Sequence, residues 1–302
     1  MNTNFLHDLA PERLDTVLAR HLEVSRAKAQ RAIKDGRILV NGIAVKAHAL
    51  VPTGAEIEVG PEVIDTTSQA EAPKLEVIFE NADVLVVNKP AGLLVHPTLA
   101  SHEPTLMDAA LKYDPSLKGV GGDLHRSGIV HRLDREASGV MIVAKNESTH
   151  KFLKDQFKQR LTDKHYTVLV LGKVAEEHGT INFPIARSSS RSRMAARPLS
   201  QEGKEAITHY EVKDRFTTTT LLDVKIETGR THQIRAHFFA LGFPVAGDKL
   251  YARRDIKALK LGRLFLHARE LTVTLPSGER QTFVAPLPDE LTATLAGLKP
   301  LR

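Results

Sequence analysis

The alternation of apolar and polar residues divides most of the chain into strand-like segments joined by turns. Segments rich in β-branched and other apolar residues predict strands at 75–79, 84–87, 139–143, 166–170, 207–212 and 221–226. Apolar residues at helical spacing predict helices at about 147–161 and 231–241. Because no βα unit repeats, the pattern favours an α+β fold with a mostly antiparallel, mixed sheet over a doubly wound fold.

The first 60 residues have a different pattern. Apolar residues recur at helical spacing from Leu14 to Leu22, and Ser25 is a candidate N-cap for a second helix. Strands are predicted near 38–42, which ends in an Asn-Gly turn, and at 55–59. The second helix is basic and carries Arg26, Lys28, Arg31 and Lys34. A basic helix beside a short hairpin is a compact design for binding RNA, although a basic run alone is also typical of a solvated helix face.

A polar, proline-bounded stretch at 61–73 predicts a linker. We therefore expect a small module at 1–60 and a catalytic domain at 74–302. The order of Arg13-Leu14-Asp15, Ser25-Arg26-Ala27, Gly36 and Val40-Asn41-Gly42 resembles the αL-type RNA-binding domain that a small-subunit ribosomal protein and several RNA-modifying enzymes contain.

Charge and composition narrow the class of partner. The 302 residues carry a formal net charge of +6 with a pI near 9.4, which favours an acidic partner such as RNA, DNA or an anionic membrane. The chain has no apolar run of about 18 residues, as a membrane span requires, and its first residues do not resemble a signal peptide, so we expect a cytoplasmic protein. It contains no cysteine, which excludes disulfides, thiolate nucleophiles and cysteine-based zinc sites.

Three segments concentrate charged residues between apolar strands, at 131–139, 164–166 and 228–237. Asp134 lies in a turn before a predicted strand, where a carboxylate is held by the scaffold and is open to a substrate. Arg235 projects from the first turn of a predicted helix, on the same side as Thr231. An arginine beside a partly buried carboxylate favours its charged form, although spacing alone also allows both to be ordinary surface residues.

The 14 histidines leave a metal site open. His131, His232 and His237 lack the spacing with a carboxylate that zinc-binding helices use, so structural or RNA-contacting roles are favoured and no metal is expected. Neither a P-loop nor a G-x-G-x-x-G motif is present. We therefore expect no nucleotide cofactor.

The chain resembles the RluA-type pseudouridine synthases, and among them the RluD-like enzymes that act on large-subunit ribosomal RNA. The resemblance rests on many short motifs in a fixed order, which run from Val87-Asn88-Lys89-Pro90-Ala91-Gly92 and Val95-His96-Pro97 through Gly128-Ile129-Val130-His131-Arg132-Leu133-Asp134, Ser138-Gly139, Lys164, Tyr166, Gly172, Gly203-Lys204, Ala206, Thr208-His209-Tyr210, Thr228-Gly229-Arg230-Thr231-His232-Gln233-Ile234-Arg235 and His237 to Gly242, Pro244, Gly247-Asp248, Tyr251 and Leu266-His267-Ala268.

The resemblance implies a role for four residues. Asp134 aligns with the essential aspartate, Arg235 with the arginine that pairs with it, and Tyr166 with the aromatic residue that packs on the target base. Arg132 aligns with the arginine that takes the place of the flipped nucleotide. Further candidates for RNA contacts are His131, Arg230, His232, Arg187 and Arg193. The departures from the family pattern are Glu136-Ala137 after the aspartate and Ser188-Ser189 in a basic stretch that bears on RNA choice.

The resemblance also implies a cofactor-free isomerisation of uridine, because the reaction changes no elemental composition. The carboxylate either attacks ribose or base, or removes the C2′ proton, and the sequence leaves both routes open. We expect a monomer that acts on large-subunit ribosomal RNA, with transfer RNA and other ribosomal sites as open alternatives. Two rival functions remain at this point: a catalytically silent RNA-binding ribosome-assembly factor and a metal-dependent nuclease.

Overall fold

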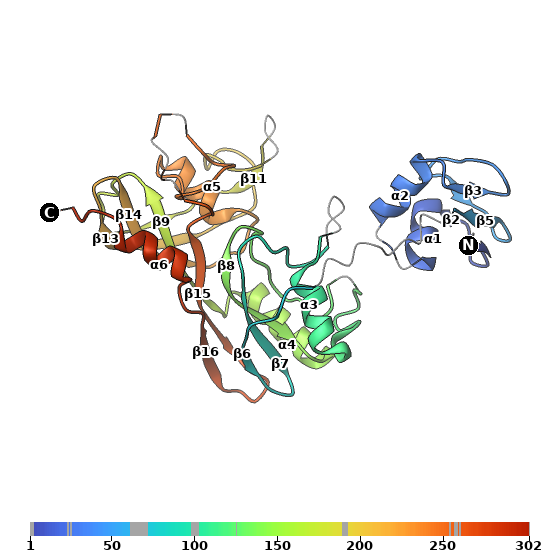
Figure 1. Ribbon diagram of the computed structural model, residues 1–302, viewed down its shortest axis with the longest axis horizontal. Helices are drawn as coiled ribbons and strands as arrows, with labels where there is room; N and C mark the ends of the chain where they lie inside the picture. The colour runs from blue at the N-terminus through green and yellow to red at the C-terminus, as the bar shows by residue number, and fades with distance from the viewer. Residues whose placement is uncertain are drawn as a thin grey trace. The chain divides into compact units, whose positions relative to one another are not determined.

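The computed structural model describes residues 3–60 except 23 and 25, residues 72–97, residues 103–188 except 125, residues 193–253, and residues 255–301 except 257, 258 and 260. Ser25 and most of the linker predicted at 61–73 lie outside these described residues. Contacts divide the chain into two compact units, Met1–Glu71 with Pro97–Glu103, and Ala72–His96 with Pro104–Arg302 (Figure 1).

The N-terminal unit packs two helices against short strands. Its elements are β1 (Thr3–Leu6), β2 (Glu12–Arg13), α1 (Leu14–His21), α2 (Arg26–Lys34), β3 (Ile38–Val40), β4 (Leu50–Val51) and β5 (Glu56–Val59). β5 lies between β1 and β3 in an antiparallel sheet, and β2 pairs with β4. The fully buried Leu14, Leu18, Ile38 and Ile57 join both helices to this sheet. The predicted helices and the two predicted strands are present here, and β1, β2 and β4 were not predicted.

The larger unit is built on one long sheet with helices beside it. Its elements are β6 (Val77–Glu80), β7 (Val84–Lys89), α3 (Leu106–Tyr113), the 3₁₀ turn η2 (Pro115–Leu117), β8 (Ser138–Ala144), α4 (Glu147–Gln159), β9 (Asp163–Leu171), β10 (His178–Ile181), β11 (Ile185–Arg187), β12 (Met194–Ala196), β13 (Thr208–Arg215), β14 (Thr219–Ile226), α5 (Gln233–Ala240), β15 (Leu266–Thr274), β16 (Arg280–Val284) and α6 (Asp289–Ala296). All six predicted strands are present, and the mixed α+β architecture is confirmed.

Strand order in the main sheet is β10-β13-β14-β9-β15-β8-β7-β6, and β16 pairs with β15. Neighbouring strands in the described part of this sheet are antiparallel except β8 and β15, which run parallel. At that pairing Gly139 has φ 124°, and a Cβ there would lie 2.1 Å from the carbonyl oxygen of Ala268. Glycine is therefore required where β8, the strand that follows Asp134, enters the sheet.

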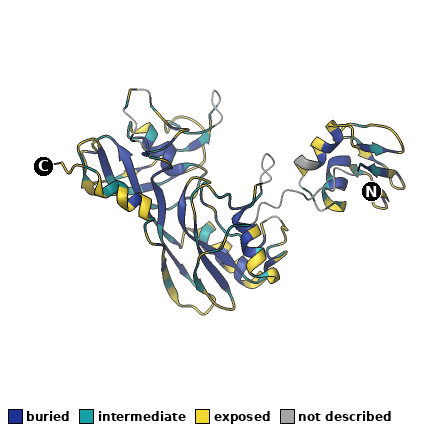
Figure 2. Cartoon of the chain, in the orientation of Figure 1, coloured by how far each residue is buried: buried dark blue, intermediate teal, exposed yellow. Residues whose placement is uncertain are grey.

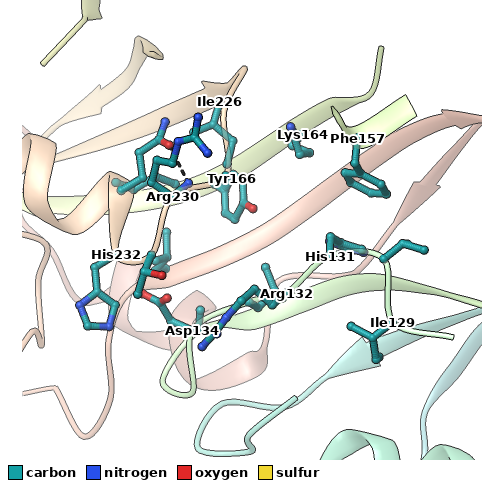
Figure 3. A pocket seen from close by; sticks show the side chains of 18 of the residues that line it. Ile129, His131, Arg132, Asp134, Phe157, Lys164, Tyr166, Ile226, Arg230 and His232 are labelled. Carbon is teal, nitrogen blue, oxygen red and sulfur yellow. Dashed lines mark hydrogen bonds between the residues drawn. The ribbon is translucent and has the colours of Figure 1, made fainter. Parts of the chain in front are cut away.

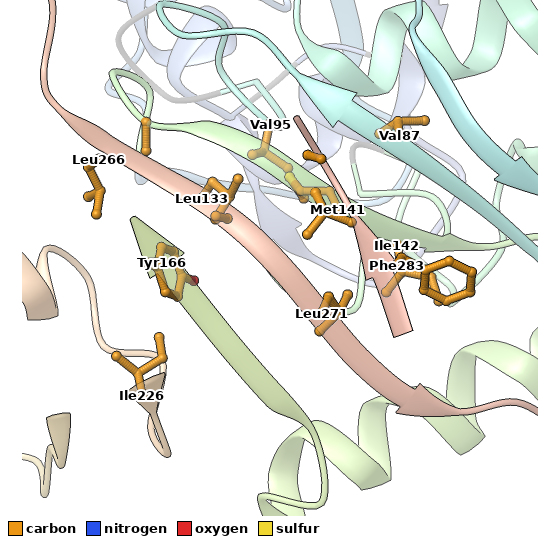
Figure 4. Packing of buried hydrophobic residues seen from close by; sticks show 14 of the residues in the cluster. Val87, Val95, Leu133, Met141, Ile142, Tyr166, Ile226, Leu266, Leu271 and Phe283 are labelled. Atoms are coloured by element: carbon orange, nitrogen blue, oxygen red, sulfur yellow. The ribbon is translucent and has the colours of Figure 1, made fainter. Parts of the chain in front are cut away.

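The core of the larger unit follows the middle of the sheet, where strands are buried along most of their length (Figure 2). Its apolar cluster includes Leu133, Tyr166, Ile226 and Leu266, which come from four different segments (Figure 4). Leu133 lies between Arg132 and Asp134 in sequence, and Tyr166 itself lines the site described below. The same packing that forms the core thus also fixes the position of the site.

Local signals explain where the two predicted helices of this unit begin and end. Asn146 caps α4 by accepting the amide of Thr149 at 2.9 Å, and Arg160 ends it with φ 62°. α5 begins at Gln233, after His232, which has φ 55°. The expectation that Thr231 and Arg235 share a helix face was therefore wrong, because Thr231 precedes the helix.

Candidate active site

Asp134 lies in the loop that leads into β8, and several contacts hold this loop in place. The fully buried Lys89 donates from Nζ to the carbonyl of Arg135 at 3.2 Å and to those of Pro90 and Leu93 at 2.8 Å. Gly92 donates its amide to the same Arg135 carbonyl at 2.7 Å. Burial lowers the pKa of Lys89 to about 7. The loop is thus tied to the end of β7 by backbone carbonyls that share one ammonium group.

His131 anchors the other end of the loop. Its Nε2 accepts the amide of Ile142 at 3.0 Å, and its ring stacks on Phe157 at a centroid distance of 4.6 Å. Burial and the nearby charge of Lys164 lower the pKa of His131 to about 3. The neutral ring is therefore part of the scaffold, and its Nε2 is occupied by the hydrogen bond from Ile142.

The loop forms one wall of a cavity of about 470 Å³ (Figure 3). A cavity of this size is typical of small-molecule and nucleotide sites. Six of the predicted site residues line this cavity. They are His131, Arg132, Asp134, Tyr166, Arg230 and His232. Tyr166 projects from β9 towards the loop that carries Asp134 and Arg132 (Figure 3).

Asp134 is paired with Arg235, as predicted. Nη1 of Arg235 lies 3.1 Å from Oδ2 of Asp134, and the side chains are 4% and 13% exposed. Glu136 lies 3.5 Å from the same Nη1. Burial opposes the charge of Arg235, but its hydrogen bonds and the charges of Asp248 and Asp134 outweigh this effect and raise its pKa. The carboxylate at the cavity wall thus faces a permanently charged guanidinium.

Asp248 completes this centre and was not predicted as a site residue. Its two oxygens accept from Nε and Nη2 of Arg235 at 2.7 and 2.9 Å, and its Oδ1 also accepts the amides of Leu250 and Tyr251. The side chain is fully buried. The motif Gly247-Asp248 was the only sequence signal for it. A two-point Asp248–Arg235 pair fixes the guanidinium plane and leaves Nη1 directed at Asp134.

Tyr166 joins the cavity to the core. Its ring packs with the apolar cluster of Leu133, Ile226 and Leu266 (Figure 4), and burial raises its pKa. The side chain is 8% exposed, so its position is fixed by packing. It presents a neutral aromatic wall to whatever occupies the cavity.

The other predicted RNA contacts lie elsewhere. Arg187 is exposed at the end of β11, and the Arg193 guanidinium lies over the rings of Phe239 and Tyr251, at 4.3 and 4.7 Å from their centroids. Neither lines the cavity. Arg26, Arg31 and Lys34 are exposed on α2 of the N-terminal unit, and the side chain of Lys28 lies outside the described residues.

Arg26 is held by Asp15, a residue of the motif Arg13-Leu14-Asp15 to which no separate role was assigned from the sequence. Asp15 is fully buried and accepts from Arg26 at 2.9 Å, from two nitrogens of Arg13 at 3.0 and 3.1 Å, and from Gln30 at 2.6 Å. These hydrogen bonds, led by that of Arg13, lower the pKa of Asp15. The surface of this unit thus carries guanidinium groups in defined positions.

The described residues contain no cluster of three or more His, Cys, Asp or Glu side chains arranged to hold a metal ion. His237 is buried, where its two ring nitrogens contact Thr208 and the carbonyl of Phe183. No helix in the described part of the chain has the length and apolar character needed to cross a membrane.

The structure thus combines an α+β fold with a nucleotide-sized cavity, and in the wall of this cavity an arginine holds a carboxylate in place. This arrangement is typical of an enzyme site. Residues 83–240 match the RNA pseudouridylate synthase family, and residues 12–57 match the S4 domain. The chain therefore belongs to the RNA pseudouridylate synthase family and carries an S4 domain. It is an RNA pseudouridine synthase, which is an isomerase, and the predicted family is confirmed.

Individual relatives agree with this assignment. The chain is 38% identical to an uncharacterized RNA pseudouridine synthase of Bacillus subtilis, YlyB, across 95% of this chain and 94% of the relative. It is 40% identical to ribosomal large subunit pseudouridine synthase D of Nitrosomonas europaea, across 97% of this chain and 86% of the relative. The fold is similar to that of human RNA pseudouridylate synthase domain containing 1, with a TM-score of 0.61, 24% identity, and coverage of 78% of this chain and 100% of that one.

Proposed function

We propose that this protein isomerises specific uridines of large-subunit ribosomal RNA to pseudouridine in the cytoplasm, with Asp134 as the catalytic carboxylate. The observation that carries the proposal is the Asp134 side chain in the cavity wall, 3.1 Å from Nη1 of a buried arginine. The choice of RNA is supported by the 40% identity to a relative named for the large ribosomal subunit.

The proposed reaction requires a carboxylate and a surface that holds the detached uracil. The bond from N1 to C1′ breaks, the uracil turns, and a bond from C5 to C1′ forms; C5 loses a proton and N1 gains one, so nothing is gained or lost overall. Asp134 begins this sequence either by attack on the substrate or by removal of the C2′ proton. Tyr166 keeps the detached uracil in the cavity by contact with its ring face, since a buried aromatic side chain is a rigid apolar surface.

A uridine reaches such a cavity only after it leaves its base stack, which costs a few kcal/mol. Arg132 is suited to offset this cost. It is exposed beside Asp134 and forms no ion pair with another described residue. Its planar guanidinium is able to stack where the base was, as guanidinium groups stack on aromatic faces.

The test is to incubate unmodified large-subunit ribosomal RNA with the enzyme and EDTA, then to map pseudouridine by carbodiimide treatment and primer extension. We expect a product at one or a few positions with the wild type and none with Asp134→Asn. Equal product from both proteins would overturn the role of Asp134. No product from the wild type would favour the silent assembly factor, and cleavage that EDTA abolishes would favour the nuclease.

A further inference from the structure

The charges around the cavity are strongly one-sided. Among the described lining residues, six carry a lysine or arginine side chain, and Asp134 is the single carboxylate. Arg132 lies two residues before Asp134, and Nε of Arg230 donates to the carbonyl of Glu205 at 2.9 Å. The remaining four, Arg126, Lys154, Lys158 and Lys164, have no part in the proposed chemistry.

Lys154 and Lys158 lie one helical turn apart on α4, which packs against β8 and β15. Residues four apart on a helix share a face, so both ammonium groups lie along one edge of the cavity. Both side chains are exposed, and neither forms an ion pair with a described residue. The adjacent Asp155 is not among the lining residues. Arg126, in contrast, lies 3.9 Å from Asp123.

Lys164 continues this row into the cavity. It lies two residues before Tyr166 on β9, so both side chains point to the same face of the sheet. The Lys164 side chain is largely buried, with Nζ 5.9 Å from the centroid of Phe157, and it lines the cavity beside that ring (Figure 3). Nζ donates to the carbonyl of Glu227 at 3.1 Å. An ammonium group has three N–H donors, so two remain for a ligand.

We infer that Lys154, Lys158 and Lys164 form a phosphate path, which binds the RNA backbone next to the uridine that enters the cavity. The inference rests on the proposed function. A flipped nucleotide stays joined to its neighbours, so at least one flanking strand must leave the cavity over its rim. Lysines without an ion pair to a described carboxylate carry the charge that a polyanion requires, and lysine binds phosphate as a point charge without reading the base.

The path predicts a change in affinity that is separate from the chemical step. Loss of one phosphate contact to a single strand lowers the slope of log K against log salt by about 0.7, which is about a 5-fold loss of affinity near 0.1 M salt. We expect the double variant Lys154→Gln/Lys158→Gln to bind unmodified large-subunit ribosomal RNA about 25-fold more weakly. Its single-turnover rate at saturating enzyme should equal that of the wild type.

A matched control removes two exposed lysines that do not line the cavity, Lys173→Gln/Lys299→Gln, and so changes the net charge by the same amount. Filter binding across a salt series, with single-turnover assays on each protein, separates the outcomes. Lys154→Arg/Lys158→Arg should restore affinity. If the two double glutamine variants lose affinity equally, or if neither does, the phosphate path is wrong while the proposed function stands. If the wild type forms no pseudouridine, both the phosphate path and the proposed function are wrong.

Discussion

Arg235 is held more firmly than a simple pair with Asp134 would require. Its Nε and Nη2 are bound by the buried Asp248, and only Nη1 is directed at Asp134. Asp248 also accepts the backbone amides of Leu250 and Tyr251. The geometry at Asp134 therefore depends on a carboxylate in the loop after α5, on the far side of the guanidinium.

We predict that Asp248→Asn weakens catalysis more than it weakens RNA binding. An amide does not supply two charged acceptors, so the guanidinium loses its fixed plane and Asp134 loses its orientation. Removing one partner of a buried ion pair costs about 3–5 kcal/mol, which urea unfolding should detect. Single-turnover rates should fall at least about tenfold while the dissociation constant stays near that of the wild type. A normal rate in Asp248→Asn would contradict this role.

His131 makes stability depend on pH. Its ordinary pKa near 6.5 is lowered to about 3 in the fold, so between these values the unfolded chain binds a proton that the folded chain does not. The contribution of His131 to the free energy of unfolding is fully present above pH 6.5 and is lost as the pH falls towards 3. From pH 6.5 to 5 this group contributes a loss of up to about 2 kcal/mol.

Urea unfolding at pH 7 and pH 5 measures this effect, with His131→Gln as the comparison. Glutamine retains an acceptor for the amide of Ile142 but does not titrate. The variant should therefore lose less stability between the two pH values than the wild type. Equal losses would show that other groups cause the pH dependence.

At the scale of elements, the sequence predicted best where each element carries its own signal. The strands from β6 to β9, β13, β14 and the helices α4 and α5 all show a period or a cap in their own residues. β15 was missed because His267, Arg269 and Glu270 interrupt its apolar pattern, although it lies at the centre of the sheet. β11 and β12 have three residues each and exist only through their pairing.

The same reasoning explains which parts of the site were predictable. Asp134 and Arg235 lie at turns where a strand or a helix begins, and the family motifs assign them together. Asp248 follows α5 in a loop with no periodic pattern of its own, and the basic edge formed by Lys154 and Lys158 is defined only by the cavity that the fold places beside α4. In the sequence alone, lysines at exposed helix positions are typical of a solvated helix face, and only the cavity beside α4 indicates another role.

The entry of β8 into the sheet provides a prediction at this scale. Gly139→Ala places a Cβ 2.1 Å from the carbonyl oxygen of Ala268, at a φ that side chains rarely adopt. We expect a loss of about 3 kcal/mol or more in the free energy of unfolding, and a loss of activity because the loop of Asp134 shifts. Gly262→Ala, with ordinary φ and nothing within 4 Å of the new Cβ, is the control and should be near neutral by thermal unfolding.

At the scale of the molecule, exposed basic side chains occur both in the S4 domain and in the catalytic unit. Arg31 and Lys34 are exposed on α2 and form no ion pair with a described residue. We predict that Arg31→Gln/Lys34→Gln weakens binding to large-subunit ribosomal RNA and lowers the salt slope by about 1.4. The single-turnover rate at saturation should not change.

Filter binding of this variant beside Lys173→Gln/Lys299→Gln gives the comparison at equal net charge. Unchanged affinity would show that α2 does not contact this RNA. A lower saturating rate would instead show that the S4 domain acts on the chemical step.

The buried carboxylate of Asp248 beside Arg235 has a consequence for the catalytic cycle. In the proposed reaction Asp134 loses its negative charge for part of each turnover, whether it forms a bond to the substrate or takes up a proton. Without Asp248, Arg235 would then be a buried cation whose nearest remaining anion is the exposed Glu136 at 3.5 Å, which is costly. Because Asp248 keeps its charge throughout, the guanidinium stays neutralised while Asp134 changes state. In the proposed reaction Asp248 is thus a permanent counterion that lowers the energy of the intermediate.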